Sequence, residues 1–228
     1  MREIALDTET TGFDPLMGDR VVEIGCVELI NHVATDRKFH CYLNPERDVP
    51  ADAVAVHGQT EDFLADKPVF AAVVGDFLDF IADSPLIIHN AEFDIKFLNA
   101  ELRRLAMPAI PISRAIDTVQ VARRRFPGAP ASLDALCRRF EIDNTDRTLH
   151  GALLDARLLA KVYLELLGGR QPGLVLAGAA IATVEGEATP VERRYREPRP
   201  HAPRDEEREA HAALLKQLKN PLWLSETA

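Results

Sequence analysis

The chain opens with Ile4-Ala5-Leu6-Asp7-Thr8-Glu9-Thr10-Thr11-Gly12, an apolar run that leads directly into two carboxylates. Residues two apart in an extended chain point to the same side, so we expect Asp7 and Glu9 to converge at the end of a short first strand. Two carboxylates placed together repel each other unless a cation neutralises them. On its own, a pair of acids at this spacing is more often a solvated surface pair.

Two more strands are expected after this one. Residues 21–30 form a long apolar run, and a third run passes through 39–43. The polar dipeptide Asn31-His32 between them predicts an antiparallel hairpin. Glu23 and Glu28 interrupt the apolar pattern of the second run, so we expect both to face outward.

From about residue 60 the apolar residues follow a helical period. An apolar stripe over 69–81 predicts a helix, and Leu86-Ile87-Ile88 predicts a short buried strand. The rest of this part is expected to hold a helix at about 90–105, a strand at 115–117, a helix ending at Phe126, and helices at 133–140 and 151–167. Three strands followed by strand–helix alternation predict an α/β domain with a mixed sheet.

Composition narrows the function classes. The 228 residues carry a net charge of −9, which argues against a protein that grips long duplex DNA through its phosphates. A pocket of carboxylates can still hold a strand end through cations, with tight retention supplied by a partner. No apolar run approaches the roughly 18 residues of a membrane helix. Charges at Arg2 and Glu3 argue against a secretory signal, so the cytoplasm is expected.

The three cysteines Cys26, Cys41 and Cys137 are widely spaced and include no Cys-x-x-Cys pair. They therefore suggest neither a zinc site nor a disulfide framework, and small residues in a reducing compartment are the expected reading.

Two further acidic segments follow strand ends or precede helices. His89-Asn90-Ala91-Glu92-Phe93-Asp94 begins a predicted helix, where Asp94 serves either the helix dipole or a site. His150-Gly151-Ala152-Leu153-Leu154-Asp155 enters the last predicted helix, where an unpaired carboxylate in an apolar stretch is costly. His150, about one turn ahead of Asp155, is a candidate general base.

Together these segments supply four carboxylates and one histidine at strand ends and helix starts, where α/β proteins build their sites. Oxygen ligands suit hard cations such as Mg²⁺ or Mn²⁺ rather than zinc. Two such ions about 4 Å apart activate a water molecule and stabilise the leaving oxygen of a phosphodiester.

The three segments resemble the motifs of the DEDD-type exonucleases that use a histidine base. Within that family, 126–128, 132–137, 141–144 and 147–151 resemble the proofreading subunits of bacterial replicative DNA polymerases. The resemblance covers about residues 3–176 closely and the tail more loosely. It implies a ribonuclease H-like fold with a five-stranded mixed sheet, and release of 5′-mononucleotides from a 3′ end.

The resemblance also implies roles for particular residues. Asp7 would bridge two metal ions, Glu9 and Asp155 would bind the ion that holds the attacking water, and Asp94 would complete the site directly or through water. His150 would take the proton from that water. The substrate-binding residues implied are Asp7, Glu9, Thr10, Asp52, His57, His89, Phe93 and Asp155.

The chain departs from the family pattern at two places. Asp52 stands where the family has a glutamate five residues before the histidine that matches His57, near the terminal nucleotide. With one methylene less, Asp52 is still expected to reach the 3′ hydroxyl. The loop after Gly12 is short, so no part of the chain is assigned to separating the DNA strands beside the site.

After residue 170 the composition changes. Gln171-Pro172-Gly173-Leu174-Val175-Leu176 fits the loose pattern of a sliding-clamp motif, although an ordinary turn after a helix has the same composition. Residues 177–204 are rich in Ala, Pro, Arg and Glu and predict a flexible linker. We expect 205–228, with Leu222-Trp223-Leu224, to bind the polymerase catalytic (alpha) subunit, and a small theta-like accessory subunit is a further candidate partner.

The sequence thus predicts an exonuclease domain over 1–170 that proofreads DNA in the nucleoid-associated replisome of a bacterium. A free-standing 3′→5′ exoribonuclease or oligonucleotide-degrading enzyme of the same family needs the same site, but it has no use for a polymerase anchor. A non-catalytic scaffold joining polymerase and clamp is the alternative from another class, and clustered carboxylates disfavour it.

Overall fold

The computed structural model describes residues 1–145, 147, 149–169 and 202–217, and the chain divides into two units, Met1–Val175 and Leu176–Ala228. The described part of the second unit consists of residues 202–204 and one helix, α8 (Asp205–Gln217). The predicted clamp motif at 171–176, most of the linker and Leu222-Trp223-Leu224 lie outside the described residues. Among the residues that are described, no helix is both long and apolar enough to cross a membrane.

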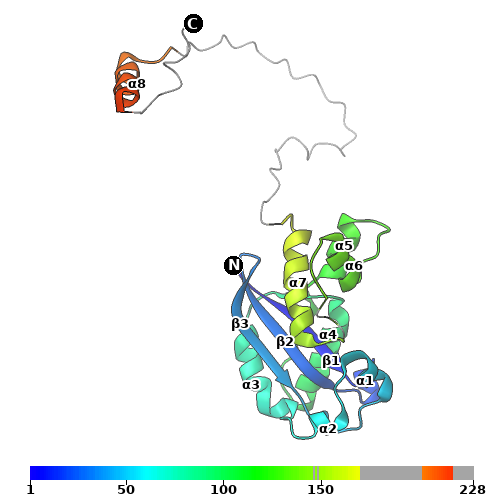
Figure 1. Cartoon of the computed structure of the whole chain (residues 1–228). Helices are drawn as coiled ribbons and strands as arrows, with labels where there is room; N and C mark the ends of the chain where they lie inside the picture. Colours follow the sequence, from blue (N-terminus) through cyan, green and yellow to red (C-terminus); the bar gives the residue numbers. More distant parts are fainter. Residues whose placement is uncertain (146, 148, 170–201, 218–228) are drawn as a thin grey trace, which may run out of the picture. The chain divides into compact units, whose positions relative to one another are not determined.

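The first unit is built on a five-stranded mixed sheet, as predicted (Figure 1). Its strand order is β3-β2-β1-β4-β5, in which β1 pairs antiparallel with β2, β2 pairs antiparallel with β3, and β4 runs parallel to both β1 and β5. The strands are β1 (Arg2–Thr10), β2 (Val21–Ile30), β3 (Val33–Tyr42), β4 (Leu86–Ile88) and β5 (Ala115–Asp117).

β1 extends further than the short apolar run predicted. It continues to Thr10 because β2 pairs with it from Arg2 opposite Ile30 to Glu9 opposite Glu23, and after a register shift of one residue Thr10 lies opposite Val21. Asp7 and Glu9 therefore lie within the strand rather than after it. Their odd positions place them on the same face of the sheet as Ala5, which packs in a hydrophobic cluster with residues of helix α7 (Ala152–Leu166).

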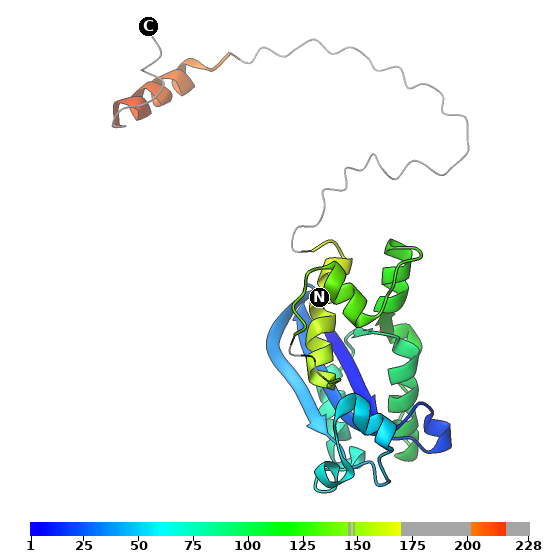
Figure 2. The same ribbon diagram turned by 45° about the vertical axis from the view of Figure 1, so that its right-hand side comes forward.

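Helices cover both faces of the sheet (Figures 1 and 2). On one face, α3 (Phe70–Ile81) and α4 (Ala91–Arg104) share a hydrophobic cluster with β1, β2 and β4. On the other, α5, α6 and α7 share a second cluster with the same strands. The remaining elements are α1 (Ala51–His57), α2 (Glu61–Leu64), α5 (Thr118–Arg125), α6 (Leu133–Arg139), α7 (Ala152–Leu166), and two short 3-10 turns at Pro15–Met17 and Ile112–Arg114.

The prediction that Glu23 and Glu28 face outward is wrong. Both are buried, with 2% and 4% of their surface exposed. Each is buried together with polar partners: the Arg2 guanidinium lies 2.6 Å from Glu28, and His40 and Gln59 lie within hydrogen-bonding distance of Glu23. Buried carboxylates are tolerated when they are paired in this way, and alternation along a strand alone does not reveal the pairing. The three cysteines are free.

Helix α7 approaches β2 through a backbone contact at Gly25. A Cβ atom at this position would overlap the backbone of Ala152 and Leu153, in the first turn of α7. This first turn is also the one that carries Asp155. The absence of a side chain at Gly25 therefore sets how closely the start of α7 lies on the sheet.

We predict that Gly25→Ala lowers the free energy of unfolding by about 1–3 kcal/mol, because backbone atoms have no flexible end that can move aside. Thermal and urea denaturation of the purified protein measure the change. The matched control is Gly75→Ala: this position lies in α3 with open space around it, and a helical alanine is expected to stabilise by up to about 1 kcal/mol. Equal stability of the two variants would contradict the contact.

Candidate active site

Three elements that are far apart in sequence bring the predicted site residues into one pocket. β1 supplies Asp7 and Glu9, the first turn of α4 supplies Asp94, and the first turn of α7 supplies Asp155. His150 lies just before α7. The pocket has a volume of about 340 Å³, and its lining includes all five side chains.

Asp94 is held against β1 by Thr8. Both the backbone N–H and the hydroxyl of Thr8 donate to Asp94 Oδ1, at 3.0 and 2.7 Å. Before α4, Asn90 adopts a left-handed conformation with φ 69°, and its N–H donates to Asp117. This turn directs the first turn of α4 towards the end of β1, so Asp94 reaches the carboxylates of the strand.

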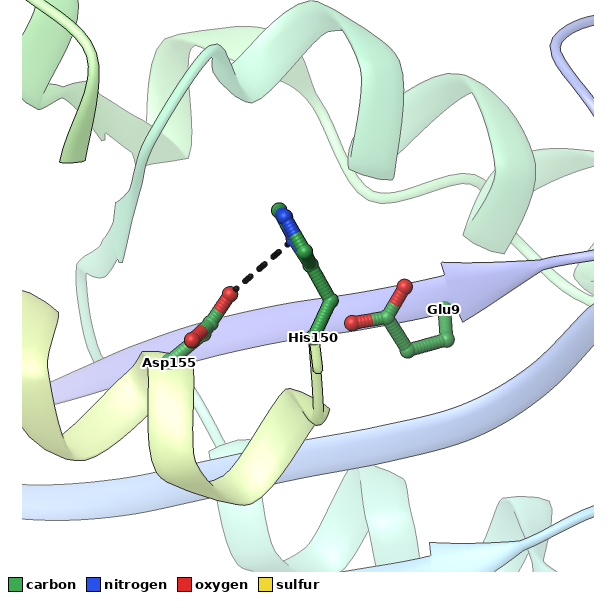
Figure 3. A group of neighbouring side chains, drawn as sticks. All are labelled: Glu9, His150 and Asp155. Carbon is green, nitrogen blue, oxygen red and sulfur yellow. Dashed lines mark ion pairs between the residues drawn. The ribbon is translucent and has the colours of Figure 1, made fainter. Parts of the chain in front are cut away.

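His150 lies beside Asp155 and Glu9, as Figure 3 shows. Ligand atoms of the three side chains all lie within 4.8 Å of one another, and His150 Nδ1 is 3.5 Å from Asp155 Oδ2. The backbone N–H of His150 donates to Val56 O at 3.0 Å, which attaches the histidine segment to α1. About half of the His150 side chain is exposed, so the ring remains accessible from the pocket.

Arg147 is the cation of the pocket, and no role was predicted for it. Its guanidinium donates to both oxygens of Asp155, each at 2.6 Å, and to Asp134 Oδ1 at 2.6 Å. A third contact, at 3.0 Å, joins Nη2 to His150 Nδ1. Only 7% of the Arg147 side chain is exposed.

Three carboxyl groups of the pocket, those of Glu9, Asp94 and Asp7, resist ionisation. Burial first, and then the charges of Asp155 and Glu23, raise the pKa of Glu9 to about 8. Burial likewise raises the pKa of Asp94 to about 7, against the hydrogen bonds from Thr8 that lower it. For Asp7, burial and the charge of Asp94 raise the pKa well above its usual range. Arg147 lowers the pKa of Asp7 and Glu9 but does not offset these effects.

The substrate-binding residues predicted from the family divide into two groups. His89 and Phe93 line the pocket with the carboxylates. Thr10, Asp52 and His57 do not line it: Thr10 donates its hydroxyl to Gly12 O, Asp52 is exposed in the first turn of α1, and His57 is buried at the end of that helix. The role of these three residues in binding substrate stays a prediction.

A larger hollow of about 1280 Å³ adjoins the pocket and shares His89, Asn90 and Ser132 with it. Its lining includes the cationic side chains Lys96, Arg123 and Arg124, and the carboxylates of the site are not part of it. The chemistry therefore belongs to the smaller pocket in spite of the larger volume beside it.

Sequence reasoning missed Thr8, Asp134 and Arg147. Thr8 stands between the two acids of the first motif, where a hydroxyl can serve a carboxylate from a neighbouring element. Arg147 is the only arginine or lysine between Glu141 and Asp155, and it precedes His150 by three residues. An isolated cation at this place in an acidic segment is a usable signal for an ion pair.

The donor set fits a divalent cation. Hard cations prefer carboxylate oxygens, and a cation placed among Asp7, Glu9 and Asp155 removes the repulsion that, after burial, raises the pKa values of the first two. Raised pKa values of clustered acids in a pocket are also typical of functional sites.

Comparison with known proteins agrees with this chemistry. The family described as Exonuclease matches residues 4–163. The DNA polymerase III subunit epsilon of Rickettsia felis is 55% identical over 186 residues, which cover 80% of this chain and 81% of the relative. The protein of the same name from Escherichia coli K12 is 46% identical over 195 residues, covering 82% and 80% of the two chains.

Solved structures show the same fold. Exonuclease X in complex with 5′ overhanging duplex DNA superposes with a TM-score of 0.56 at 28% identity, covering 73% of this chain and 90% of that one. The nuclease domain of 3′hExo, a DEDDh family member bound to rAMP, gives a TM-score of 0.63 at 20% identity, with coverage of 73% and 91%.

The raised pKa of Glu9 predicts that stability falls with rising pH when cations are chelated. An acid whose pKa is about 8 when folded, and near 4.5 when unfolded, binds its proton more tightly in the native state, so its stabilising effect is lost as pH rises towards 8. In EDTA we expect the melting temperature to drop by several degrees between about pH 6.5 and 8.5. The lowered pKa values of His57 and His89 keep these groups neutral in that window.

Thermal melts of the parent and of Glu9→Gln test this. The variant has no acid at position 9, so the part of the pH dependence that Glu9 contributes should disappear, while Asp7 and Asp94, whose pKa values are also raised, keep their part. Saturating Mg²⁺ should reduce the dependence of the parent. A parent whose melting temperature stays constant across the window would refute the assignment.

Proposed function

The chain belongs to the exonuclease family and, within it, to the DNA polymerase III epsilon subunits, and we propose that its carboxylate pocket hydrolyses the 3′ end of DNA with two divalent cations. Membership makes it a metal-dependent 3′→5′ exonuclease that proofreads within the replicative polymerase. The clustering of four carboxylates with His150 is the observation that supports the two-cation mechanism.

We assign the cations, Mg²⁺ or Mn²⁺, to the carboxylates in the roles that the family implies. Asp7 would bridge both, Glu9 and Asp155 would share the one beside His150, and Asp94 would complete the site directly or through water. When bound, the cations make a water molecule more acidic and stabilise the leaving oxygen of the phosphodiester. Thr8 fixes the position of Asp94 through two hydrogen bonds, and α7 fixes that of Asp155.

His150 accepts the proton of the attacking water. Its ring lies beside Asp155 and Glu9, the residues assigned to the cation that would hold that water, and it is exposed enough to exchange the proton with solvent. The water oxygen forms a bond to phosphorus while the bond to the 3′ oxygen of the preceding nucleotide breaks. The products are a 5′-mononucleotide and a strand with a new 3′ hydroxyl.

Selectivity for mismatched ends follows from the cost of unpairing. A terminal base that is not paired frays more easily, so it reaches the pocket as a single strand more often than a paired base does. We propose that Thr10, Asp52, His57, His89 and Phe93 hold this last nucleotide, with the Asp52 carboxylate on the 3′ hydroxyl. Phe93 lines the pocket and presents an aromatic ring to it.

A net charge of −9 disfavours tight binding of this chain to DNA, so the proposal assigns the retention of the chain on DNA to partner proteins. We propose that residues 205–228 bind the polymerase catalytic subunit, that 171–176 bind the sliding clamp, and that a small theta-like subunit is a further partner. The exposed helix α8, with Leu214 among its exposed side chains, supports a docking role for this segment. The working location is the cytoplasm, at the nucleoid-associated replisome.

The first prediction for the site concerns a primer–template with a 3′ mismatch. In Mg²⁺, the purified chain is expected to release mononucleotides, while Asp7→Ala and His150→Ala lose at least about a hundredfold in rate, since each removes a group on which hydrolysis depends. Time courses on labelled primers measure the rates. Arg138→Ala, an exposed change on α6, is the control and should match the parent.

Three outcomes would contradict the proposal. Full activity of Asp7→Ala would show that the carboxylates of β1 do not hold the cations. Faster cleavage of an RNA strand than of the matched DNA would favour the exoribonuclease alternative. If the parent protein releases no nucleotides in the presence of metal ions, the non-catalytic scaffold is the hypothesis that remains.

Removal of residues 205–228 is predicted to separate binding from chemistry. The site lies wholly in the first unit, so the shortened chain should degrade single-stranded DNA at the rate of the parent while losing its binding to the polymerase catalytic subunit. Size-exclusion chromatography with the purified subunit measures the complex. If the shortened chain still binds the polymerase catalytic subunit, the anchor lies elsewhere. The control is the double substitution Gln171→Ala with Leu174→Ala, which should weaken binding to the sliding clamp alone.

A further inference from the structure

Arg147 contacts two residues that have proposed roles in the exonuclease reaction. Its guanidinium takes both oxygens of Asp155, a proposed metal ligand, and one of its N–H groups donates to Nδ1 of His150, the proposed base. With only 7% of its side chain exposed, Arg147 is part of the pocket rather than a surface cation passing over it.

We propose that Arg147 is a built-in cation that holds Asp155 and His150 until a divalent cation displaces it, and that Asp134 then keeps the guanidinium. This inference rests on the proposed binding of a cation by Asp155. It assigns to Arg147 a positioning role in cation loading, distinct from the ligands and the base.

The geometry of Asp155 makes the competition direct. A paired guanidinium and carboxylate form two parallel hydrogen bonds, which here use Nε with Oδ1 and Nη2 with Oδ2. A divalent cation needs one of the same oxygens at about 2.0–2.1 Å if it is Mg²⁺, and its charge repels the guanidinium. Both cations are therefore not expected to hold Asp155 fully at the same time.

Asp134 gives Arg147 another partner within reach. Nη1 already donates to Asp134 Oδ1 at 2.6 Å, and the Asp134 side chain is half-exposed. The guanidinium can move towards Asp134 without leaving a buried charge unpaired, which would be costly. Displacement also ends the hydrogen bond from Nη2 to His150 Nδ1, so occupation of the metal site and release of the base occur together.

The alternative is that Arg147 is an anchor that orients Asp155 for the cation. The two readings differ in the sign of one measurement. If the guanidinium competes with the divalent cation, weakening its two hydrogen bonds to Asp155 tightens binding of that cation. If the guanidinium anchors Asp155, weakening these hydrogen bonds loosens binding of the cation. Arg147→Lys keeps the positive charge but loses the planar fork, so it tests the contact rather than the general field of the pocket.

The experiment is calorimetric titration of Mn²⁺ into the full-length protein and its variants, without DNA, so that no readout depends on activity. Arg147→Lys is expected to bind Mn²⁺ about tenfold more tightly, the change that corresponds to losing one charge-assisted hydrogen bond of the competing pair. Asp134→Asn should bind it more weakly, because the guanidinium then has only Asp155 as a charged partner. Arg138→Lys on the exposed surface of α6 is the matched control and should bind as the parent does.

Weaker or unchanged binding by Arg147→Lys overturns the inference. Asp134→Asn changes a half-exposed side chain and is expected to stay folded, so the opposite sign of its effect can be tested even if the substitution at Arg147 unfolds the protein. Asp155→Asn separates the two levels of the proposal. If Asp155→Asn abolishes Mn²⁺ binding while Arg147→Lys fails to tighten that binding, only the proposed competition is wrong. If the Asp155→Asn variant binds Mn²⁺ as the parent does, the assignment of Asp155 as a ligand is wrong as well.

Discussion

Electrostatic repulsion among the carboxylates at the end of β1 is the constraint on which the rest of the structure depends. Asp7, Glu9, Asp94 and Asp155 come from three elements, and all line one small pocket. The raised pKa values of Asp7, Glu9 and Asp94 indicate that the fold buries these three acids where their ionisation is disfavoured. Such an arrangement costs stability, and a protein keeps it where cation chemistry needs it.

The fold supports this arrangement with interactions that are largely independent of the acids. The ladder between β1 and β2 fixes the strand that carries Asp7 and Glu9, the two hydrogen bonds from Thr8 fix Asp94, and the packing of α7 on the sheet fixes Asp155. His150 is attached through its backbone to Val56, so the segment with the base is tied to the helix that carries His57. Strands, helices and one loop each position a different part of the reaction.

Most of the fold could be predicted from the sequence because its signals are local. Apolar runs and helical stripes predict the mixed sheet, and the helix ends in the structure differ from the expected ones by at most one residue at 70–81, 91–104 and 152–166. The end of β1 could not be found in this way, since Thr8 to Thr10 are polar and are strand only because β2 pairs with them. Glu23 and Glu28 were misplaced for a related reason: their partners come from other parts of the chain.

The site was predictable to a similar degree. Asp7, Glu9, Asp94, His150 and Asp155 were identified from motif spacing, and the structure brings them together. Arg147 and Thr8 were not identified, because an ion pair with Asp155 and a hydrogen bond to Asp94 depend on contacts between elements. The placement of Asp52, His57 and Thr10 outside the pocket also depends on how α1 and the loop after β1 fold, which no short motif records.

The backbone contact at Gly25 has a consequence for how the sequence of this protein can drift. Main-chain atoms of Ala152 and Leu153 occupy the space that a Cβ atom at position 25 would need, so a larger residue there would push the first turn of α7, which carries Asp155, away from β2. Position 25 is therefore closed to every residue with a side chain for as long as Asp155 has to stay beside the acids of β1.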